Sequence, residues 1–270
     1  MQRSDARGRS LFGEGPDCER RSDAVGGSHA RNSSHYFRHH PPRAVSDPEA
    51  PEPIAGQPRP VKPRLRGVSH RWAFFASLFA GVALILVAPT NRAVAAAMVY
   101  ALSLSALFGV SALYHEVTWS VPVRRWMRRL DHSMIFLLIA GTYTPLGVLV
   151  LPGTLGLVVL AVVWGGALLG MVLNMVWIDA PKWFSAIVYI SLGWVAVVAF
   201  PELVAQLGGT ATGLIVLGGV LYSAGAAVYG LRRPDPVPEV FGYHEVFHAL
   251  VIAAAVAHYA VVAFYVLPRS

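Results

Sequence analysis

The sequence predicts an all-α integral membrane protein: a seven-transmembrane-helix bundle with its N-terminus inside and its C-terminus outside. Hydrophobic residues make up 55% of the 270 residues and charged residues only 14%, with a mean hydropathy of +0.51. A soluble domain usually carries roughly 25% charged residues, so this deficit indicates lipid as the solvent. From Trp72 onward, seven apolar stretches approach the roughly 20 residues that a bilayer crossing requires. None of them shows the alternating pattern of a membrane β-barrel.

Residues 1–68 predict a disordered basic tail rich in proline and arginine. Thirteen of the 22 Lys and Arg lie in residues 1–71, and such a segment cannot bury enough apolar surface to order itself. Its His39-His40 pair could bind metal weakly, although a solvated tail is the simpler interpretation. The lone cysteine, Cys18, excludes an intramolecular disulfide and a multi-cysteine zinc site. We expect no signal peptide, and the transmembrane domain should cover residues 69–270.

Each predicted span is a continuous run of Ala, Val, Leu and Gly that ends at a short polar break. In chain order, the breaks include APTNR, LPGT, IDAPKW and RRPDPVPE. The small residues in GGALLG and GGVLYSAGAA favour close packing between helices in lipid. The expected spans are 72–89, 93–117, 130–151, 154–177, 183–204, 210–231 and 241–267.

The distribution of Lys and Arg predicts the orientation, because cytoplasmic loops carry the excess of these residues. With the tail inside, the inside loops hold seven of them and the outside segments two. The inside residues are Arg124, Arg125, Arg128, Arg129, Lys182, Arg232 and Arg233, and the outside residues are Arg92 and Arg269. The segment VPVRRWMRRLDH could also lie along the inner surface near anionic headgroups, although topology alone explains its charge.

Ionisable residues within spans are costly in lipid and are therefore functional candidates. Ser111 and His115 lie four residues apart near the end of the second span, on one helix face. Asp131 opens the third expected span. His244 and His248 lie four apart near the start of the seventh. The predicted orientation brings all five residues to the inner level of the membrane.

Three neutral imidazoles are a common ligand set for a catalytic zinc, with a fourth position left for water. An aspartate near that water could orient it and take its proton. Simpler interpretations stay open for each residue: Asp131 could cap the third helix, and the histidines could lie at the membrane edge. Their joint depth favours a metal site. His258 lies about 15 Å further along the helix, too far to share the metal, and should hydrogen-bond to a neighbouring helix.

The segment His244-Glu245-x-x-His248 has the spacing of the zinc-protease helix motif. A protease of this kind takes its third ligand from downstream, as in the metzincin extension, but ALVIAAAVAHY continues the helix here. The third ligand must therefore come from another helix, and His115 is the candidate. Glu245 lies about 100° around the helix from His244 and need not face the metal. An intramembrane metalloprotease stays open as an alternative.

Three blocks of this sequence resemble the signature blocks of the hemolysin III family. They are SALYH (Ser111–His115), LDHSMIFLLIAGTYTP (Leu130–Pro145) and FGYHEVFH (Phe241–His248). This bacterial family is grouped with the progestin and adipoQ receptors, which include the adiponectin receptors. The resemblance covers residues 65–268. It implies a bacterial inner-membrane protein in which His115, His244 and His248 bind Zn²⁺ on the cytoplasmic side, with Asp131 and Ser111 around the water.

The resemblance implies several functions. The animal relatives and the more distant alkaline ceramidases suggest a hydrolase of a membrane lipid amide, with membrane lipids as partners and no nucleic acid. The family name derives from red-cell lysis, which suggests a pore-forming protein with a structural zinc. A receptor or sensor, in which the metal holds the second, third and seventh spans together, is the third possibility.

Overall fold

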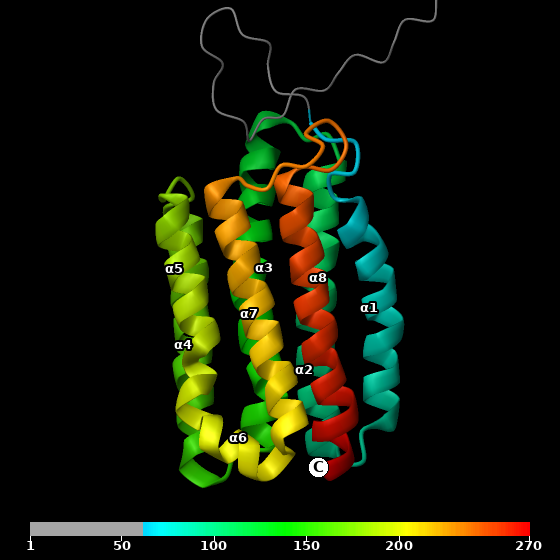
Figure 1. The fold of residues 1–270 in the computed structure, drawn as a ribbon, viewed down its shortest axis with the longest axis vertical. Coiled ribbons are helices and arrows are strands. Elements are labelled where there is room, and N and C mark those ends of the chain that lie inside the picture. The colour runs from blue at the N-terminus through cyan, green and yellow to red at the C-terminus, as the bar shows by residue number, and fades with distance from the viewer. Residues whose placement is uncertain (1–61) are drawn as a thin grey trace, which may run out of the picture. The chain divides into compact units, whose positions relative to one another are not determined.

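A computed structural model describes residues 62–270. Residues 1–61, which hold most of the predicted tail including His39 and His40, lie outside the described residues. Across 62–270 the secondary structure is helical, and the only β-type pairing is an isolated bridge between Val237 and Phe241. Within this described range, seven segments are long and apolar enough to cross a membrane, and Figure 1 shows them as a bundle. The predicted fold class is confirmed, while the orientation in the membrane stays a prediction.

The helices follow the chain order of the predicted spans. Their bounds are α1 (Val68–Val87), α2 (Asn91–Glu116), α3 (Val121–Leu149), α4 (Gly153–Val176), α5 (Lys182–Gly193), α6 (Phe200–Leu207), α7 (Gly209–Leu231) and α8 (Tyr243–Val261). A 3-10 segment, Trp194–Ala199, joins α5 to α6, so the fifth crossing consists of several pieces. After α8 the helix continues as a π turn, Val262–Val266, and a 3-10 turn, Leu267–Arg269.

The third helix begins nine residues before the predicted span 130–151. α3 starts at Val121, with Pro122 in its first turn, where a missing backbone N–H removes no intrahelical hydrogen bond. Arginine is a good helix former, so the Arg-rich segment continues the helix even though its hydropathy is low. Asp131 is therefore ten residues inside α3, and the interpretation of Asp131 as a helix cap is wrong.

The fifth crossing bends where Tyr143 of α3 reaches its backbone. The Tyr143 hydroxyl donates to Gly193 O at 2.6 Å and accepts from Ala196 N at 2.7 Å. These two bonds satisfy backbone groups that the 3-10 segment withdraws from the regular α-helical pattern. The crossing predicted at 183–204 thus runs through α5, the 3-10 segment and α6.

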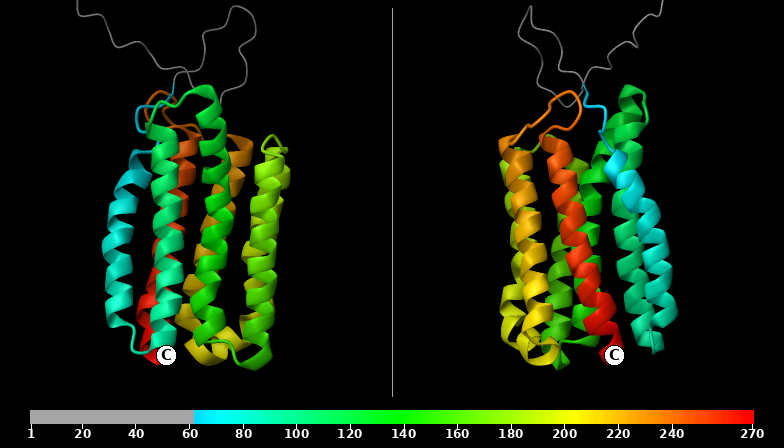
Figure 2. Two further views of the ribbon diagram at one scale, coloured as in Figure 1. Left: turned by 180° about the vertical axis from the view of Figure 1, so that it is seen from behind. Right: turned by 45° about the vertical axis from the view of Figure 1, so that its right-hand side comes forward.

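Helices α2, α3 and α8 form the interior of the bundle. Buried residues make up 56% of the most apolar 18 residues of α2 and of α3 and 44% of those of the last span. In the other four spans the share is 28% or less. Gly141 allows α3 to approach α2, since a Cβ there would lie 2.0 Å from Ser103 Oγ. Figure 2 shows α2 ending, and α3 and α8 beginning, at the end of the bundle opposite the C-terminus. We call this the site end.

Candidate metal centre

Three histidines meet at the site end of the bundle. His115 is the penultimate residue of α2, and His244 and His248 lie in the first two turns of α8. One ligand atom from each lies within 4.8 Å of the others, and His115 Nε2 is 3.2 Å from His244 Nε2. All three side chains are buried, with 3%, 3% and 1% exposure. The predicted set of three ligands is therefore brought together, and within residues 62–270 it is the one group of this kind.

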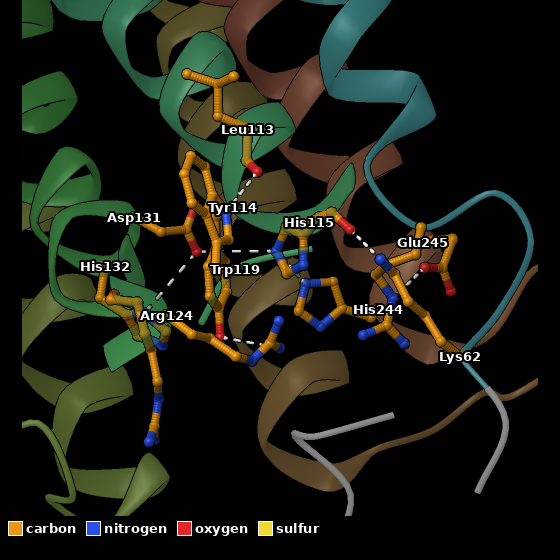
Figure 3. Close-up of polar contacts among 12 residues, drawn as sticks. Lys62, Leu113, Tyr114, His115, Trp119, Arg124, Asp131, His132, His244 and Glu245 are labelled. Atoms are coloured by element: carbon orange, nitrogen blue, oxygen red, sulfur yellow. Dashed lines mark hydrogen bonds and ion pairs between the residues drawn. The ribbon is translucent and has the colours of Figure 1, made fainter. Parts of the chain in front are cut away.

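Asp131 faces this group from α3. Its Oδ2 lies 3.8 Å from His115 Nε2 and 3.8 Å from His132 Nδ1, and Figure 3 shows it on the opposite side of His115 from His244. His132 Nδ1 also donates to the Arg128 carbonyl at 2.8 Å. The Asp131 side chain keeps 16% exposure and lines the cavity beside the histidines, so this carboxylate is close to the imidazoles and only partly buried.

Ser111 lies on α2, one helical turn before His115, and is buried. The four-residue spacing places both side chains on one face of the helix, as the sequence indicates. Its role beside the metal stays a prediction.

The carboxylate of Glu245 is engaged elsewhere. Oε1 accepts from Arg66 Nε at 2.5 Å, and Oε2 accepts from the Gly242 backbone N–H at 2.8 Å. The second bond caps the start of α8, where a carboxylate also meets the helix dipole favourably. Arg66 and Glu245 are both buried. Glu245 is therefore a structural residue in this geometry, as expected for a residue that does not face the metal.

The sequence does not predict that residues 62–67, which lead into α1, contact the site. The ammonium group of Lys62 donates to the His115 carbonyl (Figure 3), and Gly67 contacts the His115 side chain. Gly67 has φ +87°, and a Cβ there would lie 2.8 Å from His115 Cβ, so glycine suits both its conformation and this contact. Composition assigns residues up to 68 to the tail and gives no local sign of these contacts.

His258 lies apart from the metal group. Its Nε2 donates to the Ile215 carbonyl of α7 at 3.1 Å, which confirms the predicted bond to a neighbouring helix. The ring packs into the space that Gly218 leaves, since a Cβ at Gly218 would lie 2.3 Å from His258 Nε2.

A cavity of about 150 Å³ lies beside the histidines. Asp131 and His244 line it, and most of its remaining lining is aliphatic or aromatic and comes from α3, α5, α7 and α8. A second cavity of about 370 Å³ shares Tyr143, Trp194 and His258 with the first. The two cavities therefore adjoin and extend from the histidines into the bundle.

The donor set fits a metal ion. Three imidazoles are typical ligands for Zn²⁺, and imidazole also suits Cu, Fe and Ni. One nitrogen from each ring lies within 4.8 Å of the other two, so one ion could contact all three. The group could thus hold a metal, while the identity of that metal belongs to the proposal below.

Comparison with known proteins identifies the family. Residues 59–259 match the family model described as Haemolysin-III related. The chain belongs to the hemolysin III family. It is 35% identical to Hemolysin-3 of Bacillus cereus over 181 residues, which cover 67% of this chain and 80% of the relative. It is 34% identical to the Hemolysin-3 homolog of Bacillus subtilis over 167 residues, 62% of this chain and 75% of the relative.

A more distant match links the hemolysin III family to the adiponectin receptors. An ADIPOR-like receptor of Saccharomyces cerevisiae is 43% identical over 49 residues, which cover 16% of each chain. No solved structure matches the chain. Together with the seven apolar helices, these relatives establish a multi-pass membrane protein of the hemolysin III family, within the adiponectin receptor superfamily.

Proposed function

We propose that this protein is a zinc hydrolase that cleaves a membrane lipid amide at the site of His115, His244 and His248. One observation carries the proposal: three buried imidazoles converge at the wall of a cavity with the Asp131 carboxylate beside them. A bound zinc ion would supply Lewis acidity and activate water at neutral pH.

Asp131 would accept and return a proton in this reaction. Water adds to the amide carbonyl carbon and loses a proton to Asp131 Oδ2, which lies 3.8 Å from His115 Nε2. The C–N bond then breaks, and the same proton passes to the leaving nitrogen, giving a carboxylic acid and an amine. Ser111, buried one turn from His115, would donate a hydrogen bond near the same water.

The adjoining cavities favour a lipid substrate. Most of their lining is apolar, and Asp131 and His244 are among the polar groups that line the first cavity. Such a lining binds a hydrocarbon chain with little specificity along its length, whereas convergent polar groups orient the reactive end. An amide attached to an acyl chain matches both parts.

Turnover of lipid amides tests the proposal directly. Purified full-length protein in detergent is given N-acyl sphingoid bases of several chain lengths, and the released fatty acid and amine are measured by mass spectrometry. We expect release that stops after chelation and returns with added Zn²⁺. Zinc-loaded protein that cleaves none of these amides, or that cleaves them equally after chelation, would contradict the proposal.

The site would face the cytoplasm of a bacterial inner-membrane protein. The supporting observation is that the arginines at the start of α3 and in the α7–α8 connection lie at the site end, and positive loops stay inside. A reporter that is active only in the periplasm should work when fused after Ser270 and stay silent when fused near Arg125. The reverse pattern would place the site on the outer face.

A second candidate function follows from the names of the Bacillus relatives, Hemolysin-3 and Hemolysin-3 homolog. In that case the protein would be a pore-forming or haemolytic membrane protein in which zinc has a structural role. Leakage of dye from liposomes by protein with and without zinc distinguishes this function, since a hydrolase would release no dye from vesicles that lack an amide substrate.

A further inference from the structure

A fourth histidine, His70, is buried against the metal group without belonging to it. It lies in the first turn of α1 and has 3% exposure. Its ring stacks on His248 with centroids 3.7 Å apart and planes 12° apart, and its edge meets Phe108 of α2 at 5.1 Å. His70 therefore fills the space between the two helices that supply the three ligands.

The stacking excludes His70 from the ligand set. The lone pair of an imidazole nitrogen lies in the plane of its ring, so two nearly parallel stacked rings direct their lone pairs into separate planes. The metal-ligand group within residues 62–270 accordingly contains His115, His244 and His248 without His70. The His248 backbone lies near the His70 nitrogens but without regular hydrogen-bond geometry, so the ring makes its main contacts through its face and edges.

The neighbouring residues of His70 reach the same two helices. Arg66 pairs with Glu245 at the start of α8. Gly67 touches His115 near the end of α2, and Arg71 Nη1 donates to Glu116 Oε2 at 3.0 Å. Arg66 and His70 thus contact α8, and Gly67 and Arg71 contact α2, so this short segment connects the two helices.

We propose that residues 66–71 form a clamp that fixes the α2 and α8 ligands relative to each other, with His70 as the positioning residue for His248. The clamp rests on the proposed metal site. It means that residues other than the three ligands help to determine metal affinity and geometry. Residues that orient a metal ligand typically contribute 10- to 100-fold to affinity. The clamp requires a flat ring at position 70, because that ring stacks on His248.

Metal affinity of three variants tests the clamp. Full-length protein in detergent is titrated with Co²⁺ and Zn²⁺ in competition with a chelating dye, and the d–d absorption of bound Co²⁺ reports the ligand geometry. His70→Phe keeps a flat ring without nitrogens, and His70→Leu fills the space without a flat face. His258→Leu makes the same change at a buried histidine of α8 away from the metal.

We expect His70→Leu to bind both metals about 10- to 100-fold more weakly, with an altered Co²⁺ spectrum. His70→Phe should keep the wild-type affinity and spectrum and should unfold at a higher temperature, because it removes two buried unsatisfied nitrogens. His258→Leu should bind metal as the wild type does.

Two results would overturn the clamp. Wild-type affinity in His70→Leu would show that the ring has no positioning role, and lost affinity in a folded His70→Phe would show that a nitrogen is required. Failure of the wild-type protein to bind either metal would instead refute the metal site itself, so the two proposals fail separately.

Discussion

Helix α8 buries histidines in two regions, and their surroundings differ. At its start, His244 and His248 meet His115 of α2, and two ring nitrogens come within 3.2 Å. Ten residues further on, His258 is a single ring that donates to the Ile215 carbonyl and fits against Gly218. One backbone acceptor thus holds a lone buried histidine in place, whereas a metal site needs several imidazoles that converge. Convergence is what separates these two regions.

The acids beside the histidines show the same contrast. Glu245 follows His244 in the sequence, yet Arg66 and the Gly242 N–H occupy its two oxygens. Asp131 lies more than a hundred residues away along the chain, yet its carboxylate faces His115 at 3.8 Å. Proximity in the motif therefore does not decide which acid serves the site.

The largest expected effect separates these two acids. Asp131→Asn keeps the shape of the side chain and removes the proton acceptor, so turnover of a lipid amide should fall by about 10²–10⁴ while metal content is retained. Glu245→Gln should change turnover per folded molecule little. Both rates are measured on protein of known metal content. Activity that survives in Asp131→Asn and disappears in Glu245→Gln would establish the protease-type role for Glu245.

The next effect concerns stability at the start of α8. Arg66→Met leaves the buried Glu245 carboxylate without its cation, which typically costs about 3–5 kcal/mol. In the double variant Arg66→Met with Glu245→Gln both charges are gone, and Gln can still accept from the Gly242 N–H, so much of the stability should return. Thermal unfolding in detergent measures both. Equal losses in the single and the double variant would show that the ion pair is not the cause.

The smallest effect is expected at His258. Its replacement by Leu removes one hydrogen bond, worth about 0.5–1.5 kcal/mol, and should leave the metal content at the wild-type level. Thermal unfolding and elemental analysis of the same preparation check the two parts. A loss of metal in this variant would extend the site along α8 and remove the contrast between its two regions.

Much of the fold follows from local hydropathy. Seven apolar segments end at polar breaks, and the helices keep those bounds within a few residues except at α3. There, four arginines lower the hydropathy of residues that still favour a helix, so hydropathy alone places Asp131 at a helix start. The bend of the fifth crossing depends on Tyr143, which is about 50 residues away in sequence, so no local pattern could indicate it.

The ligands could be predicted because helical spacing and membrane depth place His115, His244 and His248 together. The contacts of Arg66, Gly67 and His70 could not, since they depend on how the residues before α1 pack against two distant helices. Composition describes that stretch as part of a polar tail. Tertiary packing, and not the local sequence, determines where this stretch lies.

Metal analysis of the purified wild-type protein beside His115→Ala tests most directly whether the three histidines form one site. His115 is the ligand that the α8 motif lacks, and it comes from another helix. We expect about one zinc per chain in the wild type and almost none in His115→Ala, with both proteins equally helical by circular dichroism. A full complement of zinc in folded His115→Ala would mean that α8 binds the metal with other ligands and that the three-histidine site is wrong.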